Sequence, residues 1–210
     1  MPHSKNAEEF IDEQRRAIAA NPDCGNSYYN LGVALMGQKN YDEAEKALLR
    51  AIDCSQGLAE AYVALGGIYY QRGDLERSLQ YNRMSVKARP GFSEGYGNMG
   101  FIEFQRGNLD EAIKNLERAT YFNFRFVQAL TTLANAYLMK GRVQDSIETN
   151  HKALEVQPDF APAHNNLAIA YLESGDFPRA VEHCDKAQAL GYEVAPQIVE
   201  EIEGHRKATS

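Results

Sequence analysis

The sequence predicts an all-α protein, a solenoid of antiparallel helix pairs, and three observations point to this fold class. A leucine or methionine followed by a glycine or alanine recurs at a step of 34 residues, at Leu31-Gly32, Leu65-Gly66, Met99-Gly100, Leu133-Ala134 and Leu167-Ala168. A glycine recurs at the same step where each first helix would end, at Gly73, Gly107, Gly141 and Gly175. Small residues repeat in each second helix, at Ala44, Ser78, Ala112, Ser146 and Ala180. A strict period of this length is the signature of a repeat array.

The chain is expected to begin with a helix that covers one end of the stack. Residues 1–6 are expected to be disordered, and this N-terminal cap helix lies within residues 7–24. Ile11 and Ile18 lie on its apolar face, and Pro22 ends it.

Five complete units are expected next, over residues 25–58, 59–92, 93–126, 127–160 and 161–192. Their small residues let two backbones approach closely where helices cross. The glycine after a first helix takes a left-handed conformation that costs other residues more. The first unit departs from this pattern, because Lys39 stands at the glycine position.

The last element is expected to be a helix over residues 195–207. Ile198, Val199 and Ile202 form one apolar stripe beside several glutamates, as expected of a cap that shields the final unit from water. The sequence thus predicts twelve helices, no strand, and a single solenoid over residues 7–207.

The composition is that of an acidic folded protein, with 210 residues and a net charge of -7. A surface of that sign repels phosphate backbones, so nucleic acid is not expected as a partner. No apolar run reaches the ~18 residues of a membrane span, and no signal peptide is visible. A cytoplasmic location is therefore expected, with Cys24, Cys54 and Cys184 reduced.

No residue pattern predicts catalysis, a cofactor or a metal site. The stretch from Gly95 to Gly100 fits GxGxxG, but it follows no predicted strand, and Gly100 already belongs to a packing column. The five histidines have no ligand spacing; His164 occupies a packing column, and the others are expected on the surface. The chain is therefore expected not to be an enzyme.

With these repeats, the chain resembles the tetratricopeptide repeat (TPR) family over nearly its whole length. Five units in unbroken register carry the resemblance, and the closing proline of the repeat is present as Pro22, Pro90 and Pro158. The resemblance implies a right-handed α–α superhelix whose first helices line a concave groove. It also implies that the protein works by binding other proteins.

The first helices are expected to present an apolar and aromatic face where a solvated helix would carry charge. Exposed apolar area that recurs through several helices marks a partner site. We therefore expect an extended peptide to contact Tyr29, Val33, Met36, Val63, Tyr70, Phe101, Phe104, Asn135, Leu138, Asn165 and Ile169. The alternative is that these residues provide extra packing between units.

A neighbouring row carries three asparagines, Asn30, Asn98 and Asn166. An asparagine amide both donates and accepts, so it can pair with a peptide backbone without reading its side chains. The row resembles the asparagine ladders of some TPR peptide binders; alternatively, it satisfies neighbouring repeats. These rows have no lysine or arginine, so a carboxylate clamp for chaperone C-termini is not expected.

Two further departures from the repeat carry expectations. Glu103 replaces a bulky residue inside the stack, and a buried carboxylate needs a donor, for which Asn82 is the candidate. The aromatic run from Tyr121 to Phe126 either fills the gap left by a missing proline or forms an outer contact patch, and we favour filling.

The sequence therefore predicts a protein interaction scaffold or adaptor that binds an extended peptide segment in its groove. The alternative is a structural protein that forms homo-oligomers through groove or terminal-helix contacts. A regulatory subunit of an enzyme complex fits the same sequence features.

Overall fold

The structure is a computed structural model that describes residues 7–208, and all regular elements in that range are α-helices. The first six are α1 (Ala7–Ala20), α2 (Gly25–Gly37), α3 (Tyr41–Cys54), α4 (Ala59–Gln71), α5 (Leu75–Ala88) and α6 (Ser93–Gln105). The other six are α7 (Leu109–Phe122), α8 (Val127–Met139), α9 (Val143–Val156), α10 (Ala161–Ser174), α11 (Phe177–Ala189) and α12 (Pro196–Ala208). This confirms the all-α fold class; the expectation for residues 1–6 lies outside the described residues. No helix in the described range is long and apolar enough to span a bilayer.

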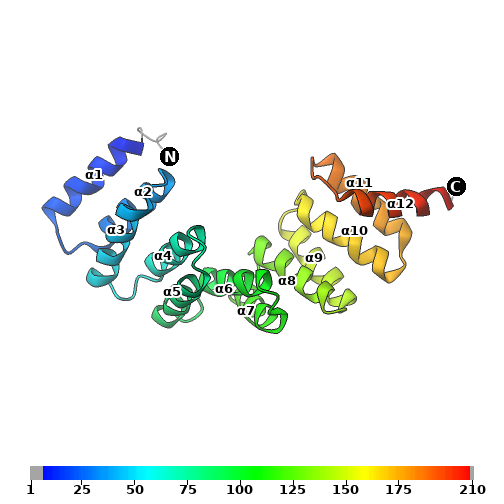
Figure 1. The fold of residues 1–210 in the computed structure, drawn as a ribbon, viewed down its shortest axis with the longest axis horizontal. Helices are drawn as coiled ribbons and strands as arrows, with labels where there is room; N and C mark the ends of the chain where they lie inside the picture. The colour runs from blue at the N-terminus through cyan, green and yellow to red at the C-terminus, as the bar shows by residue number, and fades with distance from the viewer. Residues whose placement is uncertain (1–6, 209–210) are drawn as a thin grey trace. The chain divides into compact units, whose positions relative to one another are not determined.

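The chain divides into two compact units, residues 1–99 and 100–210, with the division inside α6. Within each unit, consecutive helices pack as hairpins (Figure 1): α2 with α3 and α4 with α5 in the first, α8 with α9 and α10 with α11 in the second. Hairpins also contact their neighbours, through α3 and α4 and through α9 and α10. Each unit is therefore a stack of helix hairpins.

The turn inside each hairpin has one backbone geometry. The turn glycines have positive φ, from 71° at Gly141 to 78° at Gly175. The following N–H returns to the helix, as where the Asp74 N–H donates to the Tyr69 carbonyl at 2.9 Å. Lys39 takes the same left-handed conformation with φ of 60°, although it has a side chain.

Close helix crossings explain the glycine column. A Cβ added at Gly32 would lie 2.6 Å from Leu48 Cγ, and one added at Gly100 would lie 2.5 Å from Leu116 Cγ. Both leucines are fully buried, so any larger residue at these glycines forces the backbones of the two helices apart.

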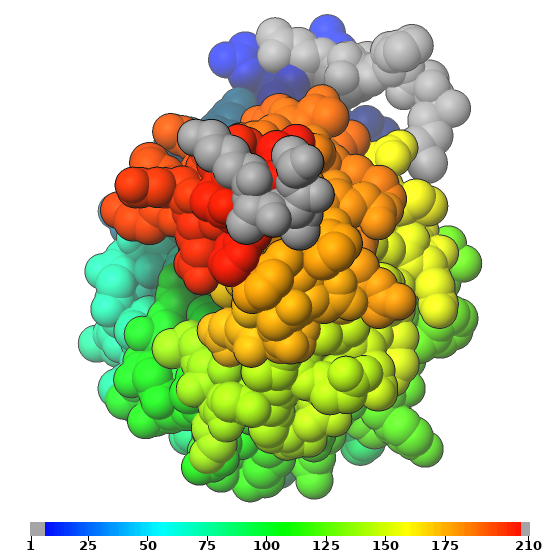
Figure 2. Space-filling view, turned by 90° about the vertical axis from the view of Figure 1, so that its right-hand side faces the viewer, coloured from blue at the N-terminus to red at the C-terminus, as the bar shows by residue number. Residues whose placement is uncertain are grey.

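The terminal helices complete the two cores. Ile11 of α1 is buried in a cluster with Leu35 and Leu48. At the other end, Ile202 of α12 is buried in a cluster with Leu167 and Cys184. Figure 2 shows this end from outside, with the red α12 against the orange α11. Both helices thus cover apolar surface that the outermost hairpins would expose.

Glu103 is buried, as its position in the repeat predicts, and its carboxylate has a donor. Asn108 Nδ2, in the turn after α6, donates to Glu103 Oε2 at 2.7 Å. The candidate from the sequence, Asn82, has other partners, since its Nδ2 donates to the Ser78 carbonyl and its Oδ1 accepts from Asn98. The donor to Glu103 is therefore a local turn residue.

Candidate functional site

In the first unit, α2 and α4 contact each other and carry four of the expected groove residues. We call Tyr29, Val33 and Met36 of α2 and Val63 of α4 the N-terminal face. Val33 is 42% exposed, and the other three are half-buried. Tyr29 and Met36 also pack against the core cluster of this unit. The face is therefore apolar, packs on the core of its unit through Tyr29 and Met36, and is partly open to solvent.

The hydroxyl of Tyr29 stays protonated in this setting. Burial raises the pKa of the Tyr29 phenol, and the negative charge of Glu60 raises it further. A neutral phenol on an apolar face can donate a hydrogen bond to a carbonyl of a bound chain.

In the second unit, α8 and α10 contact each other and form the C-terminal face, which we define as Asn135 and Leu138 of α8 with Asn165 and Ile169 of α10. All four side chains are half-buried. The side-chain amides of Asn135 and Asn165 make no hydrogen bond to any described residue. Two polar side chains with unused donors and acceptors thus lie beside two apolar ones.

The remaining apolar residues of the expected groove are also accessible. Phe101 of α6 is 40% exposed, and Phe104 on the same helix is half-buried. Tyr70 at the end of α4 is half-buried.

Two of the three asparagines in the neighbouring row bond to other side chains of the protein. Asn30 Nδ2 donates to Gln14 Oε1 at 3.4 Å, and Asn98 Nδ2 donates to Asn82 Oδ1 at 3.1 Å. Asn166 is buried. Of the two interpretations left open by the sequence, these bonds favour the one in which the row satisfies neighbouring repeats.

These amide pairs join the second helix of one repeat to the first helix of the next, and they recur at every second such contact between repeats. The sequence analysis missed this alternation. The positions of Gln14 and Asn82 are occupied by leucine in the intervening repeat, where buried Leu48 packs with Ala64. Two repeats beyond Asn82 and Asn98, the same positions hold Asn150 and Asn166, whose Oδ1 and Nδ2 atoms have no partner among the described residues. The signal was visible, since polar residues replace a leucine at every second step.

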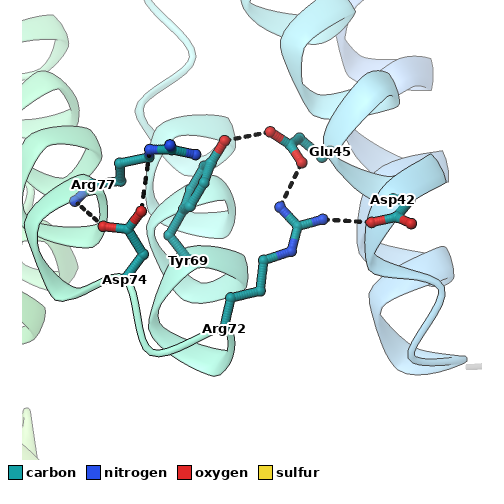
Figure 3. Close-up of polar contacts among 6 residues, drawn as sticks. All are labelled: Asp42, Glu45, Tyr69, Arg72, Asp74 and Arg77. Carbon is teal, nitrogen blue, oxygen red and sulfur yellow. Dashed lines mark hydrogen bonds and ion pairs between the residues drawn. The ribbon is translucent and has the colours of Figure 1, made fainter.

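A charged network joins α3 to α4 in the first unit (Figure 3). Arg72 donates to Glu45 and to Asp42, each at 2.6 Å, and the Tyr69 hydroxyl donates to Glu45. Burial raises the pKa of the Glu45 carboxyl, but the bonds from Tyr69 and Arg72 lower it more, so that it lies below its ordinary value. The network holds consecutive hairpins together and is not part of either face.

Three histidines gather between α9, α10 and α11. His164 and His183 are both buried, with their Nδ1 atoms 2.9 Å apart, and His151 Nε2 lies 2.9 Å from the Tyr171 hydroxyl. Burial, assisted by the charge of His164, lowers the pKa of His183 to about 4. The expectation that His183 lies on the surface is therefore wrong. Among the described residues, no group of three or more histidine, cysteine or acidic side chains is arranged to hold a metal ion.

Comparison with family models finds one description along the chain. Models described as tetratricopeptide repeat match residues 23–90, 93–125 and 131–192. Together these stretches cover more than three quarters of the sequence, including all the residues of both faces. No curated protein matches the chain.

Several solved structures share the fold. One is YrrB, described as a TPR protein with an unusual peptide-binding site: 17% identity, 94% of this chain and 99% of that chain covered, TM-score 0.71. A second is MamA, with 23% identity, 77% and 94% coverage, and a TM-score of 0.67. A third is pilF of Pseudomonas aeruginosa, with 16% identity, 95% and 89% coverage, and a TM-score of 0.74. At these identities, the likeness concerns the fold alone.

Proposed function

The chain belongs to the tetratricopeptide repeat family, and from that premise we propose that it is a scaffold or adaptor that binds an extended segment of another protein. Proteins of this family are interaction modules, and the chain is one of them rather than an enzyme. The location that we propose is the cytoplasm, on the sequence evidence given above. The similarity to YrrB, a protein with a peptide-binding site, supports the choice of a peptide ligand.

The observation that carries the proposal is the C-terminal face. Asn135 and Asn165 are half-buried amides with unused hydrogen-bonding groups, and Leu138 and Ile169 lie on the same two helices. In the free chain these half-buried amides are open to water, and a ligand with its own donors and acceptors can replace that water. An extended backbone offers both at regular spacing, and its side chains can rest on the apolar pair.

The N-terminal face supplies apolar contacts in the same way. Val33 is the most exposed of its residues, and Tyr29 adds a neutral hydroxyl donor. We assign the amide contacts to Asn135 and Asn165 rather than to Asn30 and Asn98, because the latter bond to other side chains within the protein.

The test uses short random peptides displayed on phage, selected on the whole chain, with one selected peptide then synthesised. Asn135→Ala/Asn165→Ala should weaken its binding about tenfold, since each lost hydrogen bond contributes about 0.5–1.5 kcal/mol. The matched control is Gln80→Ala/Gln188→Ala, which removes two exposed amides from second helices. Equal affinity of both double variants for the peptide would contradict the proposal.

A further inference from the structure

Two aromatic side chains near the end of α7 project into solvent. Tyr121 is 83% exposed and Phe124 is 73% exposed, the highest values among the large apolar side chains of the described residues. The expectation that this run fills the gap left by a missing proline is therefore wrong for both rings. Two exposed aromatic rings close together in the sequence are unusual on the surface of a monomeric protein.

A cavity of about 750 Å³ opens beside these two rings, between α7, α8 and α9. Leu130 and Tyr137 of α8 line its floor, and both are buried. Tyr121 and Phe124 line the same cavity. Protruding rings and a hollow thus belong to one continuous surface, which we call the α7–α9 patch. It lies apart from the C-terminal face, because Leu130 and Tyr137 stand on a different side of α8 from Asn135 and Leu138.

The charges around the cavity are balanced. Two acidic side chains, Glu117 and Glu155, and two basic ones, Arg125 and Lys152, line it. Glu117 accepts a hydrogen bond from the Tyr137 hydroxyl at 2.7 Å. Arg125, Lys152 and Glu155 form no ion pair with any described residue. The chain as a whole has a net charge of -7, so copies repel one another, and a patch of zero net charge adds no local repulsion to that between whole chains.

We propose that the α7–α9 patch binds a second copy of this chain and forms a two-fold symmetric dimer. Each copy places its Phe124 and Tyr121 rings in the cavity of the other, and each cavity's basic side chains face the acidic ones of the second copy. A surface that carries both the protruding rings and the hollow is self-complementary, and such contacts close into a dimer rather than a filament. The cavity carries side chains of both signs, and a second copy offers both signs in return. A partner with charges of one sign would attract half of these side chains and repel the other half. The inference goes beyond the proposed function, since it concerns a different surface and different residues.

The first test is the mass of the whole chain in solution, measured by sedimentation equilibrium over a concentration series. The wild-type chain should form a dimer. Tyr121→Ser/Phe124→Ser should remain a monomer with unchanged helix content, because both rings are exposed and contribute little to folding. Met139→Ser is the matched control, since Met139 is 63% exposed but does not line the cavity, and it should dimerise normally.

The second test reverses the charges. Arg125→Glu/Lys152→Glu gives an acidic cavity, and Glu155→Lys gives a basic one. Each variant alone should dimerise at least about tenfold more weakly, because like charges then face each other across the two-fold axis. An equimolar mixture of the two should recover a heterodimer. Nonspecific association of aromatic rings would not require this pairing.

A wild-type chain that remains a monomer at every concentration would overturn the proposal and leave the patch to a different protein. Dimers that persist unchanged in the double serine variant would overturn it as well. Neither result bears on peptide binding at the C-terminal face, which is measured with Asn135 and Asn165 variants. The two proposals therefore fail separately.

Discussion

At a few positions, this chain carries a residue that is unfavourable for the backbone conformation or the burial that the repeat requires there. Lys39 occupies a position that four other hairpins give to glycine, and it takes a left-handed backbone conformation. Asn82, almost completely buried, is held by a bond from Asn98. Both positions are places where one substitution has a calculable effect.

Lys39→Gly should stabilise the protein by about 0.5–1 kcal/mol, because glycine adopts φ of 60° without the steric cost that Lys39 meets. The measurement is the midpoint of urea unfolding followed by circular dichroism. Gly73→Ala is the reciprocal control, and it should lose about 1 kcal/mol. A Lys39→Gly variant less stable than the wild type would contradict this explanation.

Asn98→Ala should cost about 1–3 kcal/mol, since it leaves the buried Oδ1 of Asn82 without a donor. The double variant Asn82→Leu/Asn98→Ala reproduces the residues of the preceding junction, Leu48 and Ala64, and should recover most of that loss. The free energies of unfolding of the wild type, Asn82→Leu, Asn98→Ala and the double variant give the coupling energy. A double variant as unstable as Asn98→Ala would show that the amide pair contributes something other than mutual hydrogen bonding.

At the scale of helices, the histidine cluster lies at the contact of α10 with α11, and we expect it to make that contact sensitive to acid. His164 Nε2 donates to the Pro158 carbonyl, so its Nδ1 is an acceptor and His183 Nδ1–H is the donor. Arg179, Glu182 and Lys186 of α11 and Glu155 of α9 are the charged groups that act on the pKa values of His151 and His183.

Stability of the second unit should therefore fall as the pH drops from about 6.5 to 4. The folded pKa of His183, about 4, lies below the unfolded value near 6.5, so the unfolded chain binds the extra proton in this window. The loss approaches about 3 kcal/mol at the lower end. Hydrogen exchange of α10 and α11 amides at a series of pH values measures it.

The control for the acid effect is His183→Asn, which keeps a donor near the Nδ1 position but does not titrate. Its exchange rates, corrected for the intrinsic pH dependence, should change much less across the same window. An equally steep response in His183→Asn would assign the acid sensitivity to other groups.

For the whole molecule, the sequence predicted the fold more completely than the site. A period of 34 residues predicts the positions of both the helices and the turns, because each hairpin repeats the same local geometry. The row of Asn30 and Asn98 was harder to interpret. Whether an amide faces a ligand or the preceding helix depends on the residue opposite, here Gln14 or Asn82, and a single row does not show that.

The burial of His183 and the exposure of Tyr121 and Phe124 were not predicted for the same reason. His183 is buried against His164, a contact between helices that the spacing of histidines alone does not reveal. Phe124 and Tyr121 lie outside the repeat's packing columns, so periodicity gave no direction for their rings. Residues within the columns were predictable, and residues between them depend on neighbours from other repeats.

The most direct test of peptide binding is an NMR measurement of the side-chain amide resonances of Asn135 and Asn165, with and without a selected peptide. Both Nδ2 resonances should shift and their protons should exchange more slowly in the complex, while those of Asn98, bonded to Asn82, should change little. A peptide that binds and leaves the Asn135 and Asn165 resonances unchanged would contradict it.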